Sequence, residues 1–179
     1  MLLLISDANI LIDMEAGQLM ERLFQLPMQF AMPDILYWEE IEPGTPGLEV
    51  MGLKILEVRG EYVRYASELP DKYGTAPSPN DYLALALARQ EDCPLLTGDQ
   101  SLKTVARAED VTVMGTVWLL QAMVENRLLS VDEAIAALAL MKESRRRLPW
   151  ANAERIRKEV KSGCSRFVDK ADKLFDSDG

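Results

Sequence analysis

The residues best suited to chemistry in this sequence are acidic side chains that stand at the ends of predicted strands or inside apolar segments. They are Asp7, Glu39, Glu40, Asp81 and Asp99. Carboxylates gathered without a histidine suit Mg²⁺ or Mn²⁺, hard cations that take oxygen ligands and keep several waters. A cation held in this way lowers the pKa of a bound water and holds a phosphate oxygen, and hydrolysis of a phosphodiester requires both.

The composition removes the main alternatives to carboxylate chemistry. The 179 residues include 29 acidic and 20 basic side chains but no histidine, for a formal charge of −9. Catalysis by Ser-His-Asp or Cys-His groups, a zinc site of the HExxH type and an imidazole base are therefore excluded. With 48% hydrophobic and 27% charged residues, the chain is typical of one globular domain or a compact domain with a helical appendage.

Each acidic residue also has a purely structural explanation. Asp7 and Asp99 fit the role of ordinary loop caps, and Asp81 fits the N-cap of a helix. Glu39 and Glu40 fit a solvated helix face. The functional interpretation gains weight because all of these residues occur together in one chain.

Short apolar segments alternate with helical ones and position these side chains. Strands are predicted at Leu2–Ile5, Met28–Met32, Leu53–Val58, Pro94–Thr97 and Val111–Met114. Helices are predicted through residues 10–26 with a break at Gly17, from Pro33-Asp34 onward, at Glu61–Leu69, at Tyr82–Gln90 and from Ser101. This alternation indicates a parallel sheet covered by helices on both faces. Ligands bind beyond the carboxyl ends of such strands, where Asp7 and Asp99 fall.

The C-terminal third of the chain differs in pattern and in charge. Helices are predicted at about 116–126, at 131–147 after a Ser130-x-x-Glu133 capping box, and at 151–161. Residues 1–141 carry 9 basic and 22 acidic side chains, whereas residues 142–173 carry 11 basic and 5 acidic ones. The chain therefore has an acidic body and a basic C-terminal arm.

Cysteine usage and hydropathy predict a soluble cytoplasmic protein. Cys93 and Cys164 match no CxxC or zinc spacing and are expected to be buried or incidental thiols in a reducing compartment. The apolar start of the chain lacks a basic n-region and is broken by Ser6 and Asp7, which argues against an export signal. No apolar stretch approaches the ~20 residues needed to span a bilayer.

Four segments carry the acidic residues in a recognisable order. They are Leu3–Asp13 (LLISDANILID), Pro33–Ile41 (PDILYWEEI), Asn80–Ala88 (NDYLALALA) and Pro94–Leu102 (PLLTGDQSL). Together they resemble the PIN-domain nucleases, most closely the small bacterial and archaeal group that includes VapC-like toxins. The resemblance covers residues 1–125 and predicts a nuclease domain over 1–126, followed by a helical extension and tail over 127–179.

The resemblance implies a Rossmann-like three-layer α/β/α sandwich with a parallel central sheet. It also implies an acidic pocket that binds one or two Mg²⁺ or Mn²⁺ ions and cleaves RNA, with the catalytic and metal-binding roles carried over to Asp7, Glu40, Asp81 and Asp99. Glu40 is preferred to Glu39 because the family's glutamate usually precedes an aliphatic residue, as Glu40 precedes Ile41. One step along a helix turns a side chain by about 100°, so only one of the two glutamates is expected to face the pocket squarely.

Three further residues are interpreted through the same resemblance. Asn9 and Thr97 match polar positions that help to orient the first and last carboxylates of the family. Asp13 departs from the family pattern and is interpreted as a residue of the helix surface or as a neighbour that supports the site from behind.

The leading functional hypothesis is a metal-dependent endoribonuclease. The resemblance adds the role of toxin in a type II toxin–antitoxin pair, in which a small antitoxin protein blocks the acidic pocket. The alternative is a non-catalytic PIN-like module that binds RNA or protein, which the four intact carboxylates weigh against. A phosphatase that uses Asp7 as a nucleophile would be expected to show D-x-D, but Asn9 stands two residues on.

Two surfaces are predicted to contact partners. The basic arm could hold RNA phosphates, which an acidic body cannot do unaided, or it could be a solvated helical face. The candidate RNA-binding residues are Arg145, Arg146, Arg147, Arg155 and Lys158. The apolar helix Val117–Val124 offers a surface for a homodimer.

Overall fold

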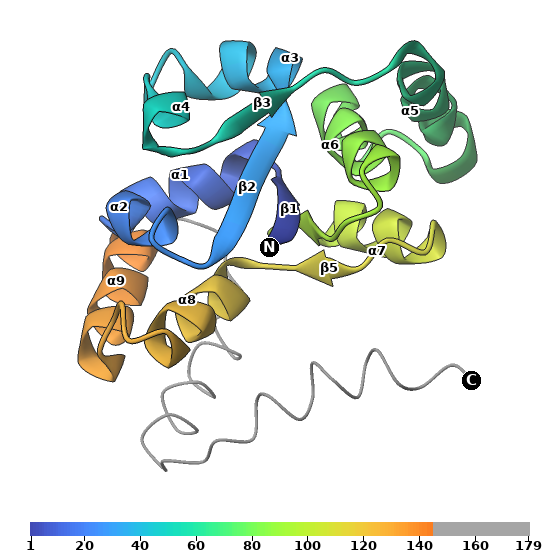
Figure 1. Cartoon of the computed structure of the whole chain (residues 1–179). Helices are drawn as coiled ribbons and strands as arrows, with labels where there is room; N and C mark the ends of the chain where they lie inside the picture. Colours follow the sequence, from blue (N-terminus) through green and yellow to red (C-terminus); the bar gives the residue numbers. More distant parts are fainter. Residues whose placement is uncertain (145–179) are drawn as a thin grey trace. The chain divides into compact units, whose positions relative to one another are not determined.

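A parallel β-sheet organises the chain in the computed structural model, which describes residues 1–144. Its strands are β1 (Leu2–Ser6), β2 (Met28–Pro33), β3 (Lys54–Leu56), β4 (Leu95–Leu96) and β5 (Val113–Met114). They lie in the order β3-β2-β1-β4-β5, and every neighbouring pair is parallel (Figure 1). The strand order reverses between β1 and β4, and ligands bind in parallel sheets at such a reversal.

The sequence of β1 explains its place in the middle of the sheet. Leu4 and Ile5 are fully buried, as a strand covered by helices on both faces requires. Ile5 lies level with Ala31 of β2 and with Leu95 of β4. The carboxyl ends of β1 and β4 therefore meet at the same level of the sheet.

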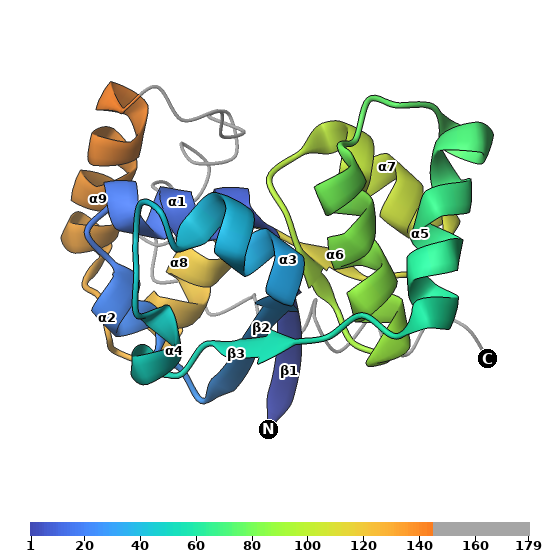
Figure 2. The same cartoon turned by 90° about the horizontal axis from the view of Figure 1, so that it is seen from above.

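Helices cover both faces of the sheet and confirm the predicted α/β fold. They are α1 (Ala8–Ala16), α2 (Met20–Leu23), α3 (Asp34–Leu36), the π-helix η1 (Tyr37–Ile41), α4 (Leu48–Met51), α5 (Gly60–Tyr73), α6 (Pro79–Gln90), α7 (Gln100–Ala108), α8 (Thr116–Glu125) and α9 (Val131–Glu143). In Figure 2, α1, α2, α8 and α9 lie on one side of β1 and β2, and α5, α6 and α7 lie on the other. This is the three-layer arrangement expected for the sheet.

Helix α6 is the buried helix predicted from its composition. Ala84, Leu85, Ala86, Leu87 and Ala88 are all inaccessible to solvent, and the helix packs against β1 and β2. It begins at Pro79 rather than at the predicted Tyr82. The earlier start has a local cause, because Ser78 caps the helix and proline fits its first turn.

The segment after β2 differs from the single helix predicted there. Helix α3 runs on into the π-helix η1, and the short helix α4 follows it. Gly47 and Gly52 bracket α4 with φ of +81° and +119°, backbone conformations that glycine adopts without a steric penalty. Apolar periodicity of 3.6 residues cannot distinguish a π-turn from an α-turn, so the sequence carried no signal for η1.

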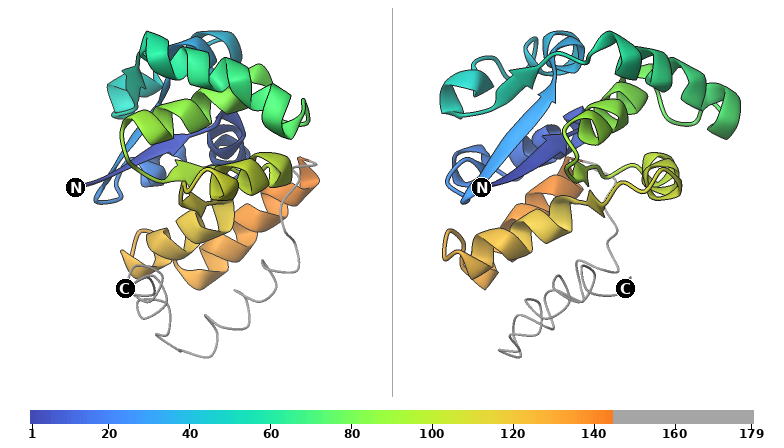
Figure 3. Two further views of the ribbon diagram at one scale, coloured as in Figure 1. Left: turned by 90° about the vertical axis from the view of Figure 1, so that its right-hand side faces the viewer. Right: turned by 45° about the vertical axis from the view of Figure 1, so that its right-hand side comes forward.

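Helices α8 and α9 pack against the first helix of the chain and lie side by side in both views of Figure 3. The capping box predicted at the start of α9 is present between Ser130 and Glu133. At Gly17 an added Cβ would lie 2.5 Å from the terminal methyl of Met141, so the end of this flexible side chain would have to move to accommodate it.

Two predictions for this part of the chain stay predictions. Leu119, Leu120 and Met123 of α8 are buried within the chain, whereas Val117, Trp118 and Val124 are partly exposed. The use of this helix as a surface for a second copy is therefore neither confirmed nor excluded. The helix predicted at 151–161 lies outside the described residues. Between Met1 and Ser144 no helix has both the length and the apolar character that a membrane crossing would require.

Candidate active site

Asp7 stands at the carboxyl end of β1 and begins α1. It is fully buried, and its Oδ1 accepts a hydrogen bond of 3.0 Å from the backbone N–H of Ile10. Its Oδ2 accepts a hydrogen bond of 2.5 Å from the hydroxyl of Thr97. Asp7 is thus the N-cap that a structural explanation predicted, but unlike an ordinary cap it has no exposed surface.

Thr97 joins the two aspartates that follow β1 and β4. Its hydroxyl donates to Asp7 and accepts a hydrogen bond of 3.1 Å from the backbone N–H of Asp99. Asp99 in turn caps α7, with Oδ1 accepting from the N–H of Leu102 at 2.7 Å. The threonine hydroxyl is therefore the link by which the ends of two adjacent parallel strands hold Asp7 and Asp99 in one place.

The protonation of Asp7 reflects the charges around it. Burial raises the pKa of Asp7 to about 7, and hydrogen bonds from Thr97 and Ile10 oppose this shift. The negative charges of Asp81 and Asp13 raise the pKa further. Asp7 therefore lies within the electrostatic field of at least two other carboxylates, and a neighbouring cation would favour its ionised form.

Asp81 is held by the capping box that opens α6. Its Oδ2 accepts a hydrogen bond of 2.7 Å from the N–H of Ser78, and its own N–H donates to the Ser78 hydroxyl at 3.1 Å. Ser78, rather than Asp81, is the N-cap. The capping box gives Asp81 a structural role in addition to the one that the resemblance implies.

Both glutamates of η1 reach the same donor on α6. The side-chain amide of Asn80 donates to Glu40 at 2.7 Å and to Glu39 at 3.0 Å. Both glutamates are exposed. The expected angular separation of the two side chains rested on α-helical geometry, whereas here the backbone is π-helical and both carboxylates share one amide.

Asp13 lies in the interior of the protein. It is only 3% exposed, and its Oδ2 accepts a hydrogen bond of 2.7 Å from the hydroxyl of Thr116. Of the two interpretations of Asp13, the helix-surface residue is therefore wrong, and the neighbour that supports the site stays a prediction. The available signal was Thr116 itself, because it stands directly after the strand β5 and Gly115, at the same edge of the sheet as Asp7.

Asn9 and Cys93 are more exposed than Asp7. Asn9 is exposed on the first turn of α1. Cys93 is a half-buried free thiol, and burial raises its pKa to about 11, so it is an unreactive cysteine. The candidate RNA-binding residues Arg145, Arg146, Arg147, Arg155 and Lys158, and also Cys164, lie outside the described residues.

The site has the donor chemistry of a hard-metal centre. Asp7, Asp81, Asp99 and Glu40 offer only oxygen atoms, which Mg²⁺ and Mn²⁺ prefer. In the described residues no three or more His, Cys, Asp or Glu side chains gather closely enough to hold an ion as they stand. Carboxylate oxygens of Asp7, Asp81 and Asp99 are instead bound by N–H groups at the starts of α1, α6 and α7. The residue types fit a divalent cation, and these oxygens would have to turn toward it.

The sequence from residue 3 to residue 162 matches a family described as a PIN domain. The chain belongs to the PIN-domain family. No curated protein matches it. PIN domains are generally nucleases that bind nucleic acid and use divalent metals, so membership agrees with an acidic site at the reversal of the strand order. The match extends beyond β5 across both α8 and α9.

Proposed function

We propose that this PIN-domain protein is a Mg²⁺- or Mn²⁺-dependent endoribonuclease of the cytoplasm, with its site at the carboxyl ends of β1 and β4. The observation that carries the proposal is the fully buried Asp7 in the field of Asp81 and Asp13, joined through Thr97 to Asp99. A buried carboxylate with other negative charges around it is costly for the fold alone and is typical of functional sites.

The residues of the chain have distinct roles in this proposal. Asp7, Asp81, Asp99 and Glu40 would hold the cation, which when bound supplies an activated water and neutralises charge on the phosphate. Thr97 keeps one oxygen of Asp7 oriented through its hydroxyl. Asn80 positions Glu40 through its side-chain amide. The proposed substrate is RNA, and in the toxin role the proposed partner is a small antitoxin protein that covers this acidic pocket.

The site assignment is tested by variants that each remove one negative charge and leave the shape of the side chain almost unchanged. We expect D7N and D99N to reduce Mn²⁺-dependent cleavage of a structured RNA by at least about 100-fold, because each removes a charged ligand. Asparagine still caps a helix, so both variants are expected to fold. The matched control is D132N, an exposed residue in the first turn of α9, which is expected to cleave like the wild type.

The outcomes separate the two function classes. Cleavage by the wild type that disappears with EDTA and in D7N supports the nuclease. Unchanged cleavage by both D7N and D99N contradicts the site assignment. A wild type that binds RNA but does not cleave it with either metal favours the non-catalytic interaction module. For the toxin role, induced expression of the wild type is expected to arrest growth of the host cells, and expression of D7N is not.

A further inference from the structure

Lys103 places a positive charge at the edge of the sheet where the acidic site lies. It stands one turn after Asp99 on α7, and its side chain is half-buried. A Cβ added to Gly115 would lie 3.7 Å from the Lys103 ammonium and 3.3 Å from the carbonyl oxygen of Thr97. The ammonium therefore stands beside the strand end that carries Thr97, in space left open by a glycine.

Thr97 connects this ammonium to the carboxylates of the site. Its hydroxyl contacts both Asp7 and the backbone of Asp99. Burial and the nearby charge of Arg107 lower the pKa of Lys103, whereas the charges of Asp7 and Asp99 raise it. Lys103 and the two aspartates are thus within one another's electrostatic influence, although Asp7 belongs to a different element from Asp99 and Lys103.

The ammonium has no bonded anion among the described residues. Lys72 and Arg89 on the neighbouring helices each reach Glu109 at 2.7 Å, whereas Lys103 makes no hydrogen bond or ion pair with any residue from 1 to 144. A partly desolvated ammonium with three donors that no residue of this part of the chain uses can hold an anion that approaches it. The charges of Asp7 and Asp99 act on the ammonium although neither carboxylate forms an ion pair with it.

We infer that Lys103 contacts a phosphate group of the RNA backbone at the bond to be cleaved, and this inference rests on the proposed function. A carboxylate-lined site repels a polyanion, so a fixed positive charge in addition to the metal would favour entry of the phosphate. Lysine suits this role because it binds phosphate as a compact point charge. The ammonium remains a hydrogen-bond donor throughout, and no proton is transferred in the proposed contact.

The test compares two lysine variants with a matched arginine on the same helix. K103M keeps the aliphatic stem and removes the charge, whereas K103R keeps the charge. R107M removes one positive charge from the exposed residue one turn further along α7. We expect K103M to lower the single-turnover rate of RNA cleavage on the order of 100-fold, as loss of one charge-stabilising donor does. K103R is expected to recover at least a tenth of the rate, and R107M to stay within threefold of the wild type.

A second measurement, the affinity for Mn²⁺, tests whether the ammonium lies near the metal site without relying on activity. Removal of a positive charge from the site should tighten Mn²⁺ binding severalfold in K103M, because the cation no longer meets a like charge. R107M is expected to bind Mn²⁺ like the wild type. Calorimetry in the absence of RNA measures both affinities, and thermal melting shows whether each variant is folded. If K103M does not fold, K103Q supplies the neutral side chain.

The results distinguish failure of this inference from failure of the proposed function. If the wild type cleaves RNA and a folded K103M or K103Q cleaves within threefold of it, the inference alone is overturned. Equal losses in K103M and R107M also overturn it, because they would show a general effect of charge. A wild type that does not cleave RNA with Mg²⁺ or Mn²⁺ overturns the inference together with the proposed function.

Discussion

The charge of Asp7 depends on its surroundings, because burial and hydrogen bonds shift its pKa in opposite directions. Its pKa in the folded chain is about 7, above the ordinary value of 3.8, because burial outweighs the hydrogen bonds that favour the ionised form. The folded state therefore holds this proton more tightly than the unfolded state. Ionisation of Asp7 costs stability as the pH rises from about 4 to 7, and above that range the full cost remains unless a cation offsets it.

The hydroxyl of Thr97 is expected to reduce that cost. T97V removes the donor to Asp7 with little change in volume, so it should lower the free energy of unfolding by about 1–3 kcal/mol at pH 8, where Asp7 is ionised. The loss should be smaller at pH 5, where Asp7 is protonated and the hydrogen bond matters less. Urea unfolding in EDTA at the two pH values measures the difference, and T97S is the control that keeps the hydroxyl. An equal loss at both pH values would assign the effect to packing and to the Asp99 backbone bond instead.

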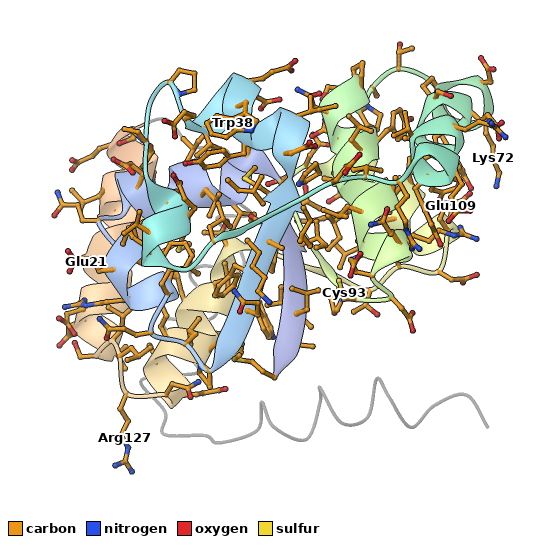
Figure 4. All side chains as sticks on the ribbon, turned by 45° about the horizontal axis from the view of Figure 1, so that its top comes forward. Glu21, Trp38, Lys72, Cys93, Glu109 and Arg127 are labelled. Atoms are coloured by element: carbon orange, nitrogen blue, oxygen red, sulfur yellow. The ribbon has the colours of Figure 1, made fainter. Side chains whose placement is uncertain are left out.

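Glu109, the residue that ends α7, joins three elements on one face of the sheet. Its Oε1 accepts from Lys72 at 2.7 Å and from Tyr73 at 2.6 Å, both on α5. Its Oε2 accepts from Arg89 of α6 at 2.7 Å and from Tyr65 at 2.9 Å. Figure 4 shows Glu109 and Lys72 on this side of the molecule. Burial alone would raise the pKa of Glu109, but hydrogen bonds from Lys72, Tyr73 and Tyr65 lower it to about 2.

The contribution of this carboxylate to stability depends on pH. A lowered pKa means that the contribution is complete above the ordinary value of 4.5 and is lost as the pH falls toward 2. E109Q should therefore lower the free energy of unfolding by about 1–2 kcal/mol at pH 7, a value reduced for the solvent exposure of Lys72 and Arg89. The loss should shrink at pH 3. The control is E61Q, whose exposed pair with Arg59 spans 3.9 Å and should contribute within about 0.5 kcal/mol. A loss from E109Q that is the same at pH 3 and pH 7 would contradict a charge effect.

The same elements show why sequence patterns predicted some features and missed others. The apolar runs of β1 and α6 and the capping box of α9 are local signals, and the structure contains all three elements. The π-helix η1 has no local signal because apolar periodicity does not distinguish it from an α-helix. Asp13 accepts a hydrogen bond inside the protein from Thr116, 103 residues later, and no local spacing predicts that contact.

At the scale of the whole molecule, charge is distributed unevenly between the described body and the rest of the chain. Residues 1–141 carry 22 acidic side chains against 9 basic ones. Several of those basic residues are already paired, such as Arg22 with Glu133 and both Lys72 and Arg89 with Glu109. The other basic side chains of the body are outnumbered by its carboxylates, which repel an RNA backbone. Residues 142–173 carry 11 basic side chains and are the larger source of positive charge.

The basic arm is expected to supply phosphate contacts in addition to those at the site. Replacement of Arg145, Arg146 and Arg147 by glutamine in the full chain should weaken RNA binding in EDTA. It should also reduce the magnitude of the slope of log K against log salt concentration by about 2, because each contact with a phosphate of a single strand contributes about 0.7 to that slope. The control replaces Arg64, Arg107 and Arg127, three exposed arginines of the body, by glutamine and removes the same total charge. Equal salt slopes in the wild type and the arm variant would mean that the arm is a solvated face. Equal losses of RNA affinity in both triple variants would mean that net charge, rather than contact by the arm, governs binding.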